Sequence, residues 1–431
     1  MAGQVPRKVL IIGGGFAGLA CARRLANDDR FAVTLVDRTN HHLFQPLLYQ
    51  VATTSLAAPD IARSIRQILA KARNVTVLMD EIPTLDPAAK TATGASGTVY
   101  RFDTLVLAAG ARTGYFGHDE WARHTLALKS LADAQTVRRT VLANLERAEL
   151  TDDAGERERL MTVAIVGGGP TGVELAGAFA DLVHRSLKSN FRRIDTRQLR
   201  VILIEGSERV LEAYDEDQSA YAKDRLCSLG VEVWTGKRVD QITHGRLHFT
   251  SGEELATAAI IWAAGVAANP LAAALGVPTD RGGRVCPAPD LSLPGQSDIF
   301  VAGDLVAMKD LDDKPVPGVA PAAVQMGHHI AEILLAEGGL PPDAPRPPRA
   351  GFRYFDKGLM AIIGKNHAVV KSGRFRLRGP VAWLAWLLVH ILFLIGFRNK
   401  LGVLLGWAFA YLKDNPSARV IVNPPPAASG S

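Results

Sequence analysis

The chain has 431 residues and 48% of them are hydrophobic, so it can form two or three domains with complete cores. Its net charge is +6, yet residues 344–431 hold 13 Lys and Arg against two acids, a balance of +11 that leaves −5 for the rest. A basic excess confined to the tail excludes a nucleic-acid-binding face on the main body and indicates an anionic membrane surface as partner.

The first recognisable element is a glycine-rich turn after a short apolar run, Val9 to Ile12, that predicts a parallel strand. The chain enters this run almost at once, so we expect no signal or transit peptide and a reducing, cytoplasmic setting. The turn fits G-x-G-x-x-G between a strand and a helix, a pattern that binds the pyrophosphate of a dinucleotide at the helix start. The expected contact residues are Gly13, Gly15, Phe16, Ala17 and Gly18.

The second strand, Ala32 to Val36, ends in Asp37, 19 residues past Gly18. An acid at that strand end can bind a ribose 2′-OH. A surface acid that caps the next turn is the alternative. Arg38, directly after it, is also expected to contact the cofactor.

The loop from Asn40 to Ala52 is rich in aromatic and amide groups and nearly uncharged, which suits a cover over a planar ring system. His41 and His42 could be metal ligands, but no carboxylate or cysteine follows at ligand spacing, so packing, capping or flavin contact is favoured. An amphipathic helix is expected from Asp60 to Lys71. Strands are expected at Val75 to Met79 and Thr98 to Phe102.

A second pattern, an apolar run that ends in Ala-Ala-Gly, occurs twice along the chain. The segment from Thr104 to Gly110 is echoed by the segment from Ala259 to Gly265 at an offset of 155 residues, and a second glycine-rich turn follows the first at an offset of 154. This indicates an internal duplication, and therefore two bound dinucleotides rather than a single structural nucleotide. Small residues at the two strand ends let the backbone approach the cofactors: Ala109, Gly110, Ala264 and Gly265.

The second turn follows an apolar run, Val163 to Val166, and comes after an expected helix, Ala132 to Glu149, and a charged connection, Thr151 to Arg159. Its expected cofactor contacts are Gly167, Gly169, Thr171 and Gly172.

Two acids belong to this second unit. Glu205 ends the strand Val201 to Ile204, where a carboxylate accepts the 2′-OH of NADH and repels the 2′-phosphate of NADPH. Glu174 has two interpretations that the sequence leaves open. It either opposes the helix macrodipole in the first helical turn, or faces the nicotinamide and flavin, where it orients the ring or relays a proton.

From Gly283 the chain is expected to return to the first domain. The segment Ser297 to Asp304 predicts a strand that ends in Gly-Asp, and Asp304 suits hydrogen bonding to the ribityl chain or phosphates of a flavin. A helix follows from Pro321, and its positive N-terminus, with Ala323 and Val324, would stabilise the charge of a reduced flavin.

The tail begins after a proline-rich linker, Pro341 to Pro348. The segment Phe352 to Val370 alternates strand signals at Arg353 to Phe355, Met360 to Ile363 and Ala368 to Val370, consistent with a small sheet. Two apolar runs follow, Val381 to Phe397 and Leu401 to Leu412, separated by cations and containing Trp383, Trp386 and Trp407. These lengths favour helices lying in one membrane leaflet, with a single span and a buried dimer interface as alternatives.

These features together resemble the type II NADH dehydrogenases, which are single-subunit NADH:quinone oxidoreductases that do not pump protons. The motifs that carry the resemblance span nearly the whole chain: the turn 13–18, the loop 44–49, Ala108-Ala109-Gly110, the stretch 167–174, Ala302-Gly303-Asp304, the helix of Gln325, the strand region 356–358 and the aromatic tail.

The resemblance implies FAD as prosthetic group, NADH as substrate, a membrane quinone (ubiquinone or menaquinone) as acceptor, and a homodimer at the cytoplasmic face of the inner (plasma) membrane. The family's quinone pattern, Ala-Gln-x-Ala-x-Gln, reads Ala320-Pro321-Ala322-Ala323-Val324-Gln325 here. Only Gln325 is carried over as a quinone-side amide, because Pro321 replaces the first glutamine. The expected catalytic residues are Glu174 and Gln325.

The expected fold is α/β, with two Rossmann-like dinucleotide-binding domains for FAD and NADH and a C-terminal amphipathic helical membrane anchor. The expected domains are 1–118 with 283–343 for FAD, 119–282 for NADH, and 350–431 for the small sheet and anchor. No metal site and no nucleic acid are expected.

Two rival functions remain. A sulfide:quinone or disulfide-reducing flavoprotein is opposed by the cysteines, because Cys21, Cys227 and Cys286 lie far apart with no C-x-x-C pair. A redox-sensing protein that regulates a membrane partner through NADH occupancy is the alternative of a different class.

Overall fold

The structure, a computed structural model of the whole chain, describes residues 5–183, 187, 190–338, 340, 346–413 and 419–421. The chain forms two compact units, each made of three segments. Unit 1 comprises Met1–Leu43, Arg63–Arg112 and Val266–Lys357. Unit 2 comprises Phe44–Ala62, Thr113–Gly265 and Gly358–Ser431.

Unit 1 is built on a six-stranded sheet of order β20-β21-β9-β1-β2-β5. All neighbours pair in parallel except β20 with β21. The strands are short apolar runs, and the central strand β9 is buried along its whole length, as expected for a parallel sheet covered on both faces. Their bounds are β1 Arg7–Ile12, β2 Phe31–Asp37, β5 Val75–Met79, β9 Thr104–Leu107, β20 Ser292–Leu293 and β21 Gln296–Val301.

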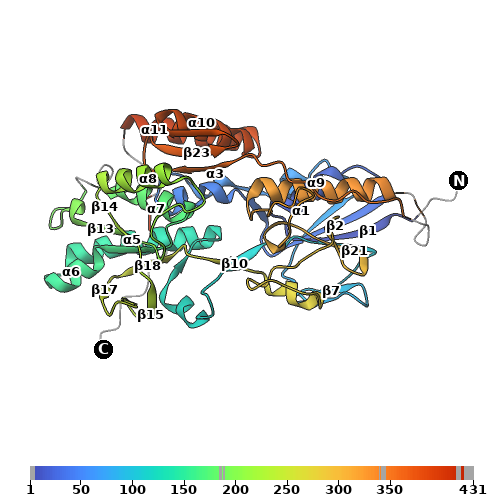
Figure 1. Cartoon of the computed structure of the whole chain (residues 1–431), viewed down its shortest axis with the longest axis horizontal. Helices are drawn as coiled ribbons and strands as arrows, with labels where there is room; N and C mark the ends of the chain where they lie inside the picture. The colour runs from blue at the N-terminus through green and yellow to red at the C-terminus, as the bar shows by residue number, and fades with distance from the viewer. Residues whose placement is uncertain are drawn as a thin grey trace. The chain divides into compact units, whose positions relative to one another are not determined.

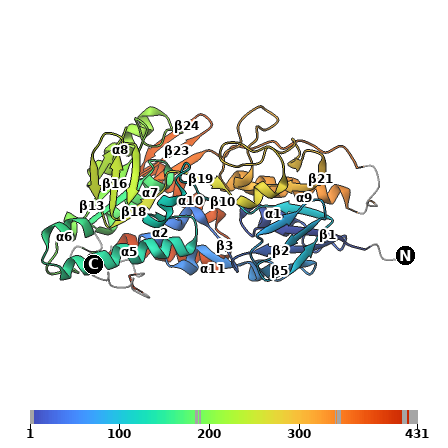
Figure 2. The same ribbon diagram turned by 90° about the horizontal axis from the view of Figure 1, so that it is seen from below.

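Two helices of unit 1, α1 (Phe16–Arg24) and α9 (Ala320–Glu337), lie side by side next to this sheet (Figures 1 and 2). They approach closely because Gly327 has no side chain: a Cβ there would lie 2.2 Å from the carbonyl oxygen of Ala17. The smaller elements are β3 His41–Leu43, β4 Ala62–Ser64, α4 Ile65–Ile68, β6 Thr84–Asp86, β7 Thr91–Thr93, β8 Val99–Arg101, β10 Ala111–Thr113, β19 Val266–Ala268, η5 Pro270–Leu275 and η6 Gly303–Leu305.

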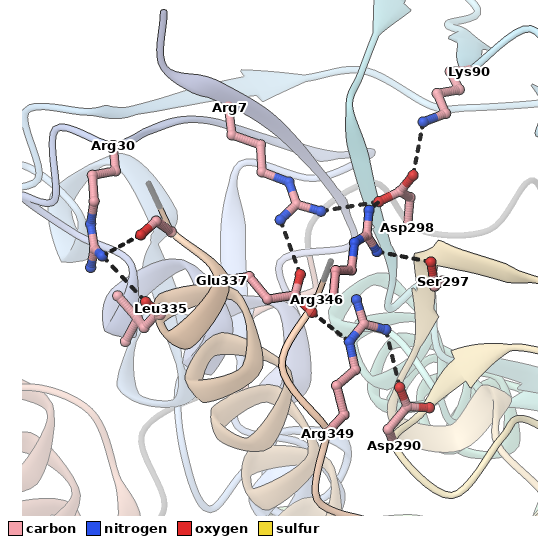
Figure 3. A network of polar contacts seen from close by, with 11 residues as sticks. Arg7, Arg30, Lys90, Asp290, Ser297, Asp298, Leu335, Glu337, Arg346 and Arg349 are labelled. Atoms are coloured by element: carbon pink, nitrogen blue, oxygen red, sulfur yellow. Dashed lines mark hydrogen bonds and ion pairs between the residues drawn. The ribbon is translucent and has the colours of Figure 1, made fainter. Parts of the chain in front are cut away.

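An ion-pair network lies at the amino ends of these strands (Figure 3). Arg7, the first residue of β1, bonds Asp298 of β21 at 3.0 Å and Glu337, the last residue of α9, at 3.2 Å. Glu337 also pairs with Arg349 at 2.6 Å, and their side chains are only 2% and 10% exposed. Arg346 contacts Asp298 as well. The network thereby ties the stretch 346–349 to the sheet.

Unit 2 repeats the plan with a five-stranded parallel sheet of order β11-β18-β12-β13-β14. An antiparallel sheet of β15, β16 and β17 contributes to the same core. The strands are β11 Leu126–Ala127, β12 Thr162–Val166, β13 Arg200–Ile204, β14 Val231–Trp234, β15 Val239–Thr243, β16 Arg246–Phe249, β17 Glu254–Ala256 and β18 Ala259–Trp262. The helices are η1 Gln45–Leu47, α2 Leu48–Ala52, α3 Ala58–Ile61, η2 Asp119–His124, α5 Leu131–Leu150, α6 Ala154–Leu160, α7 Pro170–Asp181, η4 Thr196–Gln198 and α8 Glu216–Ser228.

The C-terminal part of unit 2 is a three-stranded antiparallel sheet followed by two helices. The sheet lies between α10 on one side and α7 and α8 on the other (Figure 1). Gln218 of α8 fastens it, because its side-chain amide donates to the carbonyl oxygens of Val370 at 2.9 Å and Leu377 at 3.2 Å. The bounds are β22 Leu359–Ile362, β23 Ala368–Ser372, β24 Phe375–Gly379, α10 Pro380–Phe393 and α11 Phe397–Lys413.

The expected α/β fold with two mainly parallel sheets is confirmed, and so are the strands beside the glycine-rich turns. The long helix after residue 131 is confirmed too; its cap is Ser130, whose hydroxyl accepts from the N–H of Asp133 at 3.1 Å. Three local predictions are wrong.

The segment Asp60 to Lys71 is not one helix, because it breaks into α3, β4 and α4. β4 pairs with β3, and the N–H of Ile65 bonds the carbonyl of Asn40 at 3.0 Å in place of a helical partner. The connection Thr151 to Arg159 contains a helix, α6, capped by Asp153. In the small sheet, β24 takes the place expected for Arg353 to Phe355.

Candidate functional site

The first glycine-rich turn has the geometry of a phosphate cradle. Gly13 has φ of +106°, and a Cβ there would lie 2.3 Å from the carbonyl oxygen of Ala108. A Cβ on Gly18 would lie 1.9 Å from the carbonyl oxygen of Gly13, so this position also requires glycine for the helix to pack on the turn. Gly15, the N-cap of α1, faces open space. The N-terminal N–H groups of α1 are therefore accessible to an anion.

Asp37 is held at the end of β2 beside this turn. Its Oδ2 accepts from the N–H of Gly14 at 2.7 Å, and its Oδ1 accepts from the N–H and hydroxyl of Thr39 at 2.7 and 2.8 Å. The carboxylate is thus fixed next to the glycine-rich turn. Arg38, which follows, is exposed.

The turn that carries Asp304 and the first turn of α9 both lie beside helix α1. Gly303 has φ of +76°, and a Cβ there would be 3.7 Å from the Cβ atoms of both Ala17 and Ala323. The structure therefore brings together the turn that carries Asp304, helix α1 and the first turn of α9. Ala109 also lies beside Gly13, since its N–H is 3.1 Å from the position of a Cβ there.

His42 packs against the first cradle and was predicted only as a packing, capping or flavin-contact residue. Its Nδ1 lies 3.0 Å from the carbonyl oxygen of Gly14, and its ring meets Phe16 edge-on at 5.0 Å between centroids. Burial lowers the pKa of His42, so the ring is neutral and Nδ1 carries the proton that bonds Gly14. Among the described residues, no cluster of His, Cys, Asp or Glu is arranged to hold a metal ion.

The second turn has nearly the same geometry as the first. Gly167 has φ of +113°, and a Cβ there would lie 2.6 Å from the backbone of Ala263 and Ala264. A Cβ on Gly172 would lie 1.9 Å from the carbonyl oxygen of Gly167, as Gly18 does to Gly13. Gly169, the N-cap of α7, again faces open space. Such a repeat of close approaches is what two dinucleotide cradles require.

Glu205 corresponds to Asp37. Its Oε2 accepts from the N–H of Gly168 at 2.6 Å, and its Oε1 accepts from the N–H of Ser207 at 2.7 Å. The carboxylate is therefore fixed at the end of β13 beside the second turn. Gly265 ends the neighbouring segment, and Phe116 lies within 2.9 Å of where its Cβ would be.

Glu174 lies beyond the first turn of α7, which contains no acid, so its placement in the first turn is wrong. The macrodipole effect falls off within one turn and no longer accounts for it. The carboxyl group instead faces the C-terminal part of unit 2: its Oε1 accepts from the N–H of Ile362 at 3.4 Å.

The surroundings of Glu174 favour its neutral form. Burial raises its pKa to about 8, and the N–H groups of Ile362 and Trp386 oppose this only in part. The indole Nε1 of Trp386 lies beside the carboxyl group without meeting hydrogen-bond geometry. The hydroxyl of Tyr214 is buried with no partner among the described residues, and this burial raises the pKa of the hydroxyl.

Gln325 is fixed by the backbone of Phe355. Its Nε2 donates to the carbonyl oxygen of Phe355 at 3.0 Å, and its Oε1 accepts from the N–H of the same residue at 2.9 Å. One N–H and one lone pair of the amide stay available for a ligand. Val324 beside it is partly exposed, as is Pro321 at the start of α9.

The segment Phe44–Ala62 is held by α11, which the sequence did not indicate. Trp407 donates from Nε1 to Gln50 Oε1 at 2.8 Å, and Gln50 Nε2 donates to the hydroxyl of Tyr49 at 2.8 Å. Asn399 donates to the carbonyl oxygens of Pro59 and Asp60 at 2.9 and 3.0 Å. These contacts join residues more than 330 positions apart, so no local pattern could reveal them.

Comparison with known proteins gives consistent results. Residues 7–327 match the family described as pyridine nucleotide-disulphide oxidoreductase. The chain is 40% identical to the type II NADH:quinone oxidoreductase Ndh of Mycobacterium tuberculosis, over 95% of this chain and 89% of that protein. It is 38% identical to NdhA of the same organism, over 94% and 87%.

The fold is also similar to that of a solved structure, NDH2 from Plasmodium falciparum in complex with NADH. The TM-score is 0.86 at 20% identity, and the match covers 97% of this chain and 100% of the other.

Proposed function

The chain belongs to the type II NADH:quinone oxidoreductases, within the pyridine nucleotide-disulphide oxidoreductase family, and we propose that it oxidises NADH and reduces a membrane quinone through FAD in a respiratory chain, without pumping protons. The observation that carries this proposal is the 40% identity over 95% of the chain, together with two glycine-rich turns of matching geometry.

FAD fits the first cradle. Gly13, Gly15 and Gly18 leave room for a pyrophosphate against the N-terminus of α1, and Asp37 is fixed for a ribose hydroxyl. Asp304 would accept from the ribityl chain or bond near the phosphates. The remaining expected contacts are Phe16, Ala17, Arg38, Ala109, Gly110, Ala323 and Val324.

NADH fits the second cradle, with the pyrophosphate against the N-terminus of α7 near Gly167, Gly169, Thr171 and Gly172. Glu205 is fixed to accept a 2′-OH, and its negative charge disfavours a 2′-phosphate. Ala264 and Gly265 let the backbone approach the cofactor.

FAD and NADH, when held in the two cradles, would supply the redox chemistry of hydride transfer and quinone reduction. The protein positions these groups and handles protons. Quinone reduction takes up two protons, and Glu174, whose pKa is raised to about 8, holds a proton near neutral pH that it can release. The free N–H of Gln325 would bond a quinone oxygen.

The C-terminal helices are proposed as a membrane anchor on one leaflet. No helix in the described part of the chain is both long and apolar enough to cross a bilayer. Helix α10 nevertheless exposes a stripe of apolar side chains, each 58–63% exposed, at a spacing of three to four residues: Val381, Leu384, Leu388 and Leu392. On α11, Leu401, Leu404 and Leu405 are 45–51% exposed. Such a stripe fits the boundary between headgroups and acyl chains.

Attachment to the cytoplasmic face of the inner (plasma) membrane, ubiquinone or menaquinone as acceptor, and a homodimer complete the proposal. The functional division into residues 1–118 with 283–343 for FAD, 119–282 for NADH, and 350–431 for the small sheet and anchor also stays a prediction.

Absorption spectroscopy of the purified protein tests the proposal. We expect a flavin spectrum that NADH bleaches in a stopped-flow experiment, NADPH scarcely affects, and a quinone restores. A flavin that sulfide reduces but NADH does not would favour the sulfide enzyme. Bleaching by NADH with no reoxidation by any quinone would favour the redox sensor.

A further inference from the structure

The turn of the β23–β24 hairpin, residues 372–375, places an aromatic side chain in solvent. Ser372 pairs with Phe375, and Gly373 and Arg374 form the turn between them, with Gly373 at φ of +52°. Phe375 is 74% exposed, more than any residue of the apolar stripe on α10. A two-residue turn needs no aromatic residue beside it, and a side chain this exposed makes little contact with the rest of the chain. Neither the turn nor packing within the chain therefore explains Phe375.

The direction of Phe375 follows from the alternation of the strand. Arg376 contacts Asp215 at the start of α8, and Arg378 lies 3.9 Å from Asp217 of the same helix, so these two side chains point to the α8 side of the sheet. Successive side chains of a strand point to opposite faces. Phe375 and Leu377 therefore lie on the other face, which is the one that α10 covers.

On that side of the sheet, α10 carries its apolar stripe. The helix packs inward through Ala382 and Trp386, which are fully buried, while Leu384 and Leu388 are turned outward. Phe375 thus stands on the side of the sheet where the exposed apolar surface of α10 lies. Helix α8 contacts β23 from the opposite face of the sheet (Figures 1 and 2).

The charge at the turn is net positive, because the four cations Lys371, Arg374, Arg376 and Arg378 meet only two carboxylates, Asp215 and Asp217. Lys371 and Arg376 share Asp215, with Lys371 Nζ 2.8 Å from its carboxylate, and Arg378 is near Asp217. Arg374 is exposed and has no ion-pair partner in the described part of the chain. An aromatic ring beside a free guanidinium is the combination that enters the headgroup region of an anionic leaflet.

We propose that the hairpin turn is a second membrane contact, in which Phe375 enters the headgroup boundary of an anionic leaflet and Arg374 binds a lipid phosphate. This inference rests on the membrane attachment proposed above for α10 and α11, and adds to it a preference for anionic lipid. The two contacts add, because the binding of an interfacial protein increases with the buried apolar area and with the electrostatic attraction to anionic lipids.

The test is partition of the full chain onto vesicles of phosphatidylcholine, with or without phosphatidylglycerol, by co-sedimentation. Arg374→Gln should weaken binding to the anionic vesicles about fivefold at low salt and have no effect on neutral vesicles. Phe375→Ser should weaken binding to both about tenfold. At 1 M salt, where the Debye length is about 3 Å, the effect of Arg374→Gln should disappear.

The controls are Arg66→Gln on α4, which is an exposed arginine, and Leu150→Ser at the end of α5, which is 75% exposed. Neither should change partition. NADH oxidation with a water-soluble quinone is measured on every variant and should match the unmodified chain, which shows that each variant is folded and that the proposed activity holds.

The proposal would be overturned if the variants at 374 and 375 bound anionic vesicles as the unmodified chain does. An acidic protein would then be the remaining partner for this turn. An equal loss on neutral and anionic vesicles for Arg374→Gln would also overturn it. Failure of the unmodified chain to oxidise NADH with a soluble quinone would instead contradict the proposed function, independently of the vesicle result.

Discussion

At the scale of single residues, Glu205 and Asp37 hold equivalent positions, each bonded to the N–H of the middle glycine of its turn at 2.6 and 2.7 Å. Only Glu205 belongs to the unit proposed for NADH. Glu205→Gln removes the charge that repels a 2′-phosphate while keeping an oxygen for the N–H of Gly168. We expect the preference for NADH over NADPH, measured as the ratio of kcat/KM, to fall by about tenfold or more.

Asp37→Asn is the matched control for this prediction. It makes the same change of charge in the other cradle, so it should alter FAD content and leave the ratio between NADH and NADPH unchanged. A change of coenzyme preference in Asp37→Asn, or none in Glu205→Gln, would show that the two cradles are assigned the wrong way round.

Glu174 predicts a dependence of stability on pH. Its pKa in the folded chain is about 8, against an ordinary value of 4.5. Between these values the folded chain holds a proton that the unfolded chain has lost, so this group's stabilising contribution, complete below about pH 4.5, is lost as the pH rises to about 8. The Glu174→Gln variant cannot ionise at this position. The Tm of the unmodified chain should therefore fall relative to the Tm of this variant as the pH rises from about 4.5 to about 8.

The control is Glu212→Gln, an exposed glutamate of the same unit, whose Tm should follow that of the unmodified chain at every pH. Turnover measured over the same range reports the proposed proton transfer: Glu174→Gln should lose the limb of the pH profile near 8 and retain a flavin that NADH reduces. Unchanged turnover with intact flavin would remove Glu174 from the mechanism.

At the scale of elements, the C-terminus of α9 is fixed by charge. Glu337 is 2% exposed and pairs with Arg7 of β1 and with Arg349. Glu337→Gln removes the buried carboxylate that Arg7 and Arg349 share and leaves each guanidinium only its second partner, Asp298 or Asp290. We expect it to lower the free energy of unfolding by about 3 kcal/mol in urea titrations. Glu332→Gln, on the same helix, breaks an exposed pair with Arg24 and should change stability by less than about 1 kcal/mol.

The sequence predicts elements well where one local pattern decides the structure. The apolar runs before Gly13 and Gly167 form buried strands, and the acids at Asp37 and Glu205 lie beside their turns. Each strand, turn and acid belong to one continuous stretch of the chain, so a local pattern contains the geometry. The segment Asp60 to Lys71 fails because a helical pattern does not show that β3 and the carbonyl of Asn40 compete for its N–H groups.

The neighbours of Glu174 could not be predicted for a related reason. Ile362 of β22 lies 188 residues after Glu174, and Trp386 of α10 lies farther still along the chain. An apolar run also does not show which of its tryptophans is buried. The sequence therefore locates the carboxylate but not the surroundings that raise its pKa.

At the scale of the whole molecule, the exposed stripe of α10 predicts a separation between soluble and membrane activities. Leu384→Glu and Leu388→Glu together place two charges on a surface that makes no core contact, because both side chains are about 60% exposed. We expect unchanged activity with a water-soluble quinone, and a loss of about tenfold or more with a long-tail quinone in liposomes.

Leu150→Glu, at an exposed site outside the C-terminal helices, is the control and should leave both activities unchanged. Equal loss with both quinones in the double variant would place α10 in the catalytic body rather than at the membrane. Point charges are a sharper test than deletion of residues after Gly379, because deletion also removes Trp386 and Trp407, which are buried in unit 2.

The hydrogen bond from Trp407 to Gln50 has a consequence for biosynthesis. Gln50 leaves the ribosome 357 residues before its partner, and at about 5–20 residues per second the nascent chain waits on the order of half a minute for it. During that interval the amide oxygen of Gln50 must stay hydrated, so segment 44–62 cannot close into its final packing. We expect a nascent chain that stops short of α11 to be cleaved by protease within that segment, while the β1–β2 region already resists.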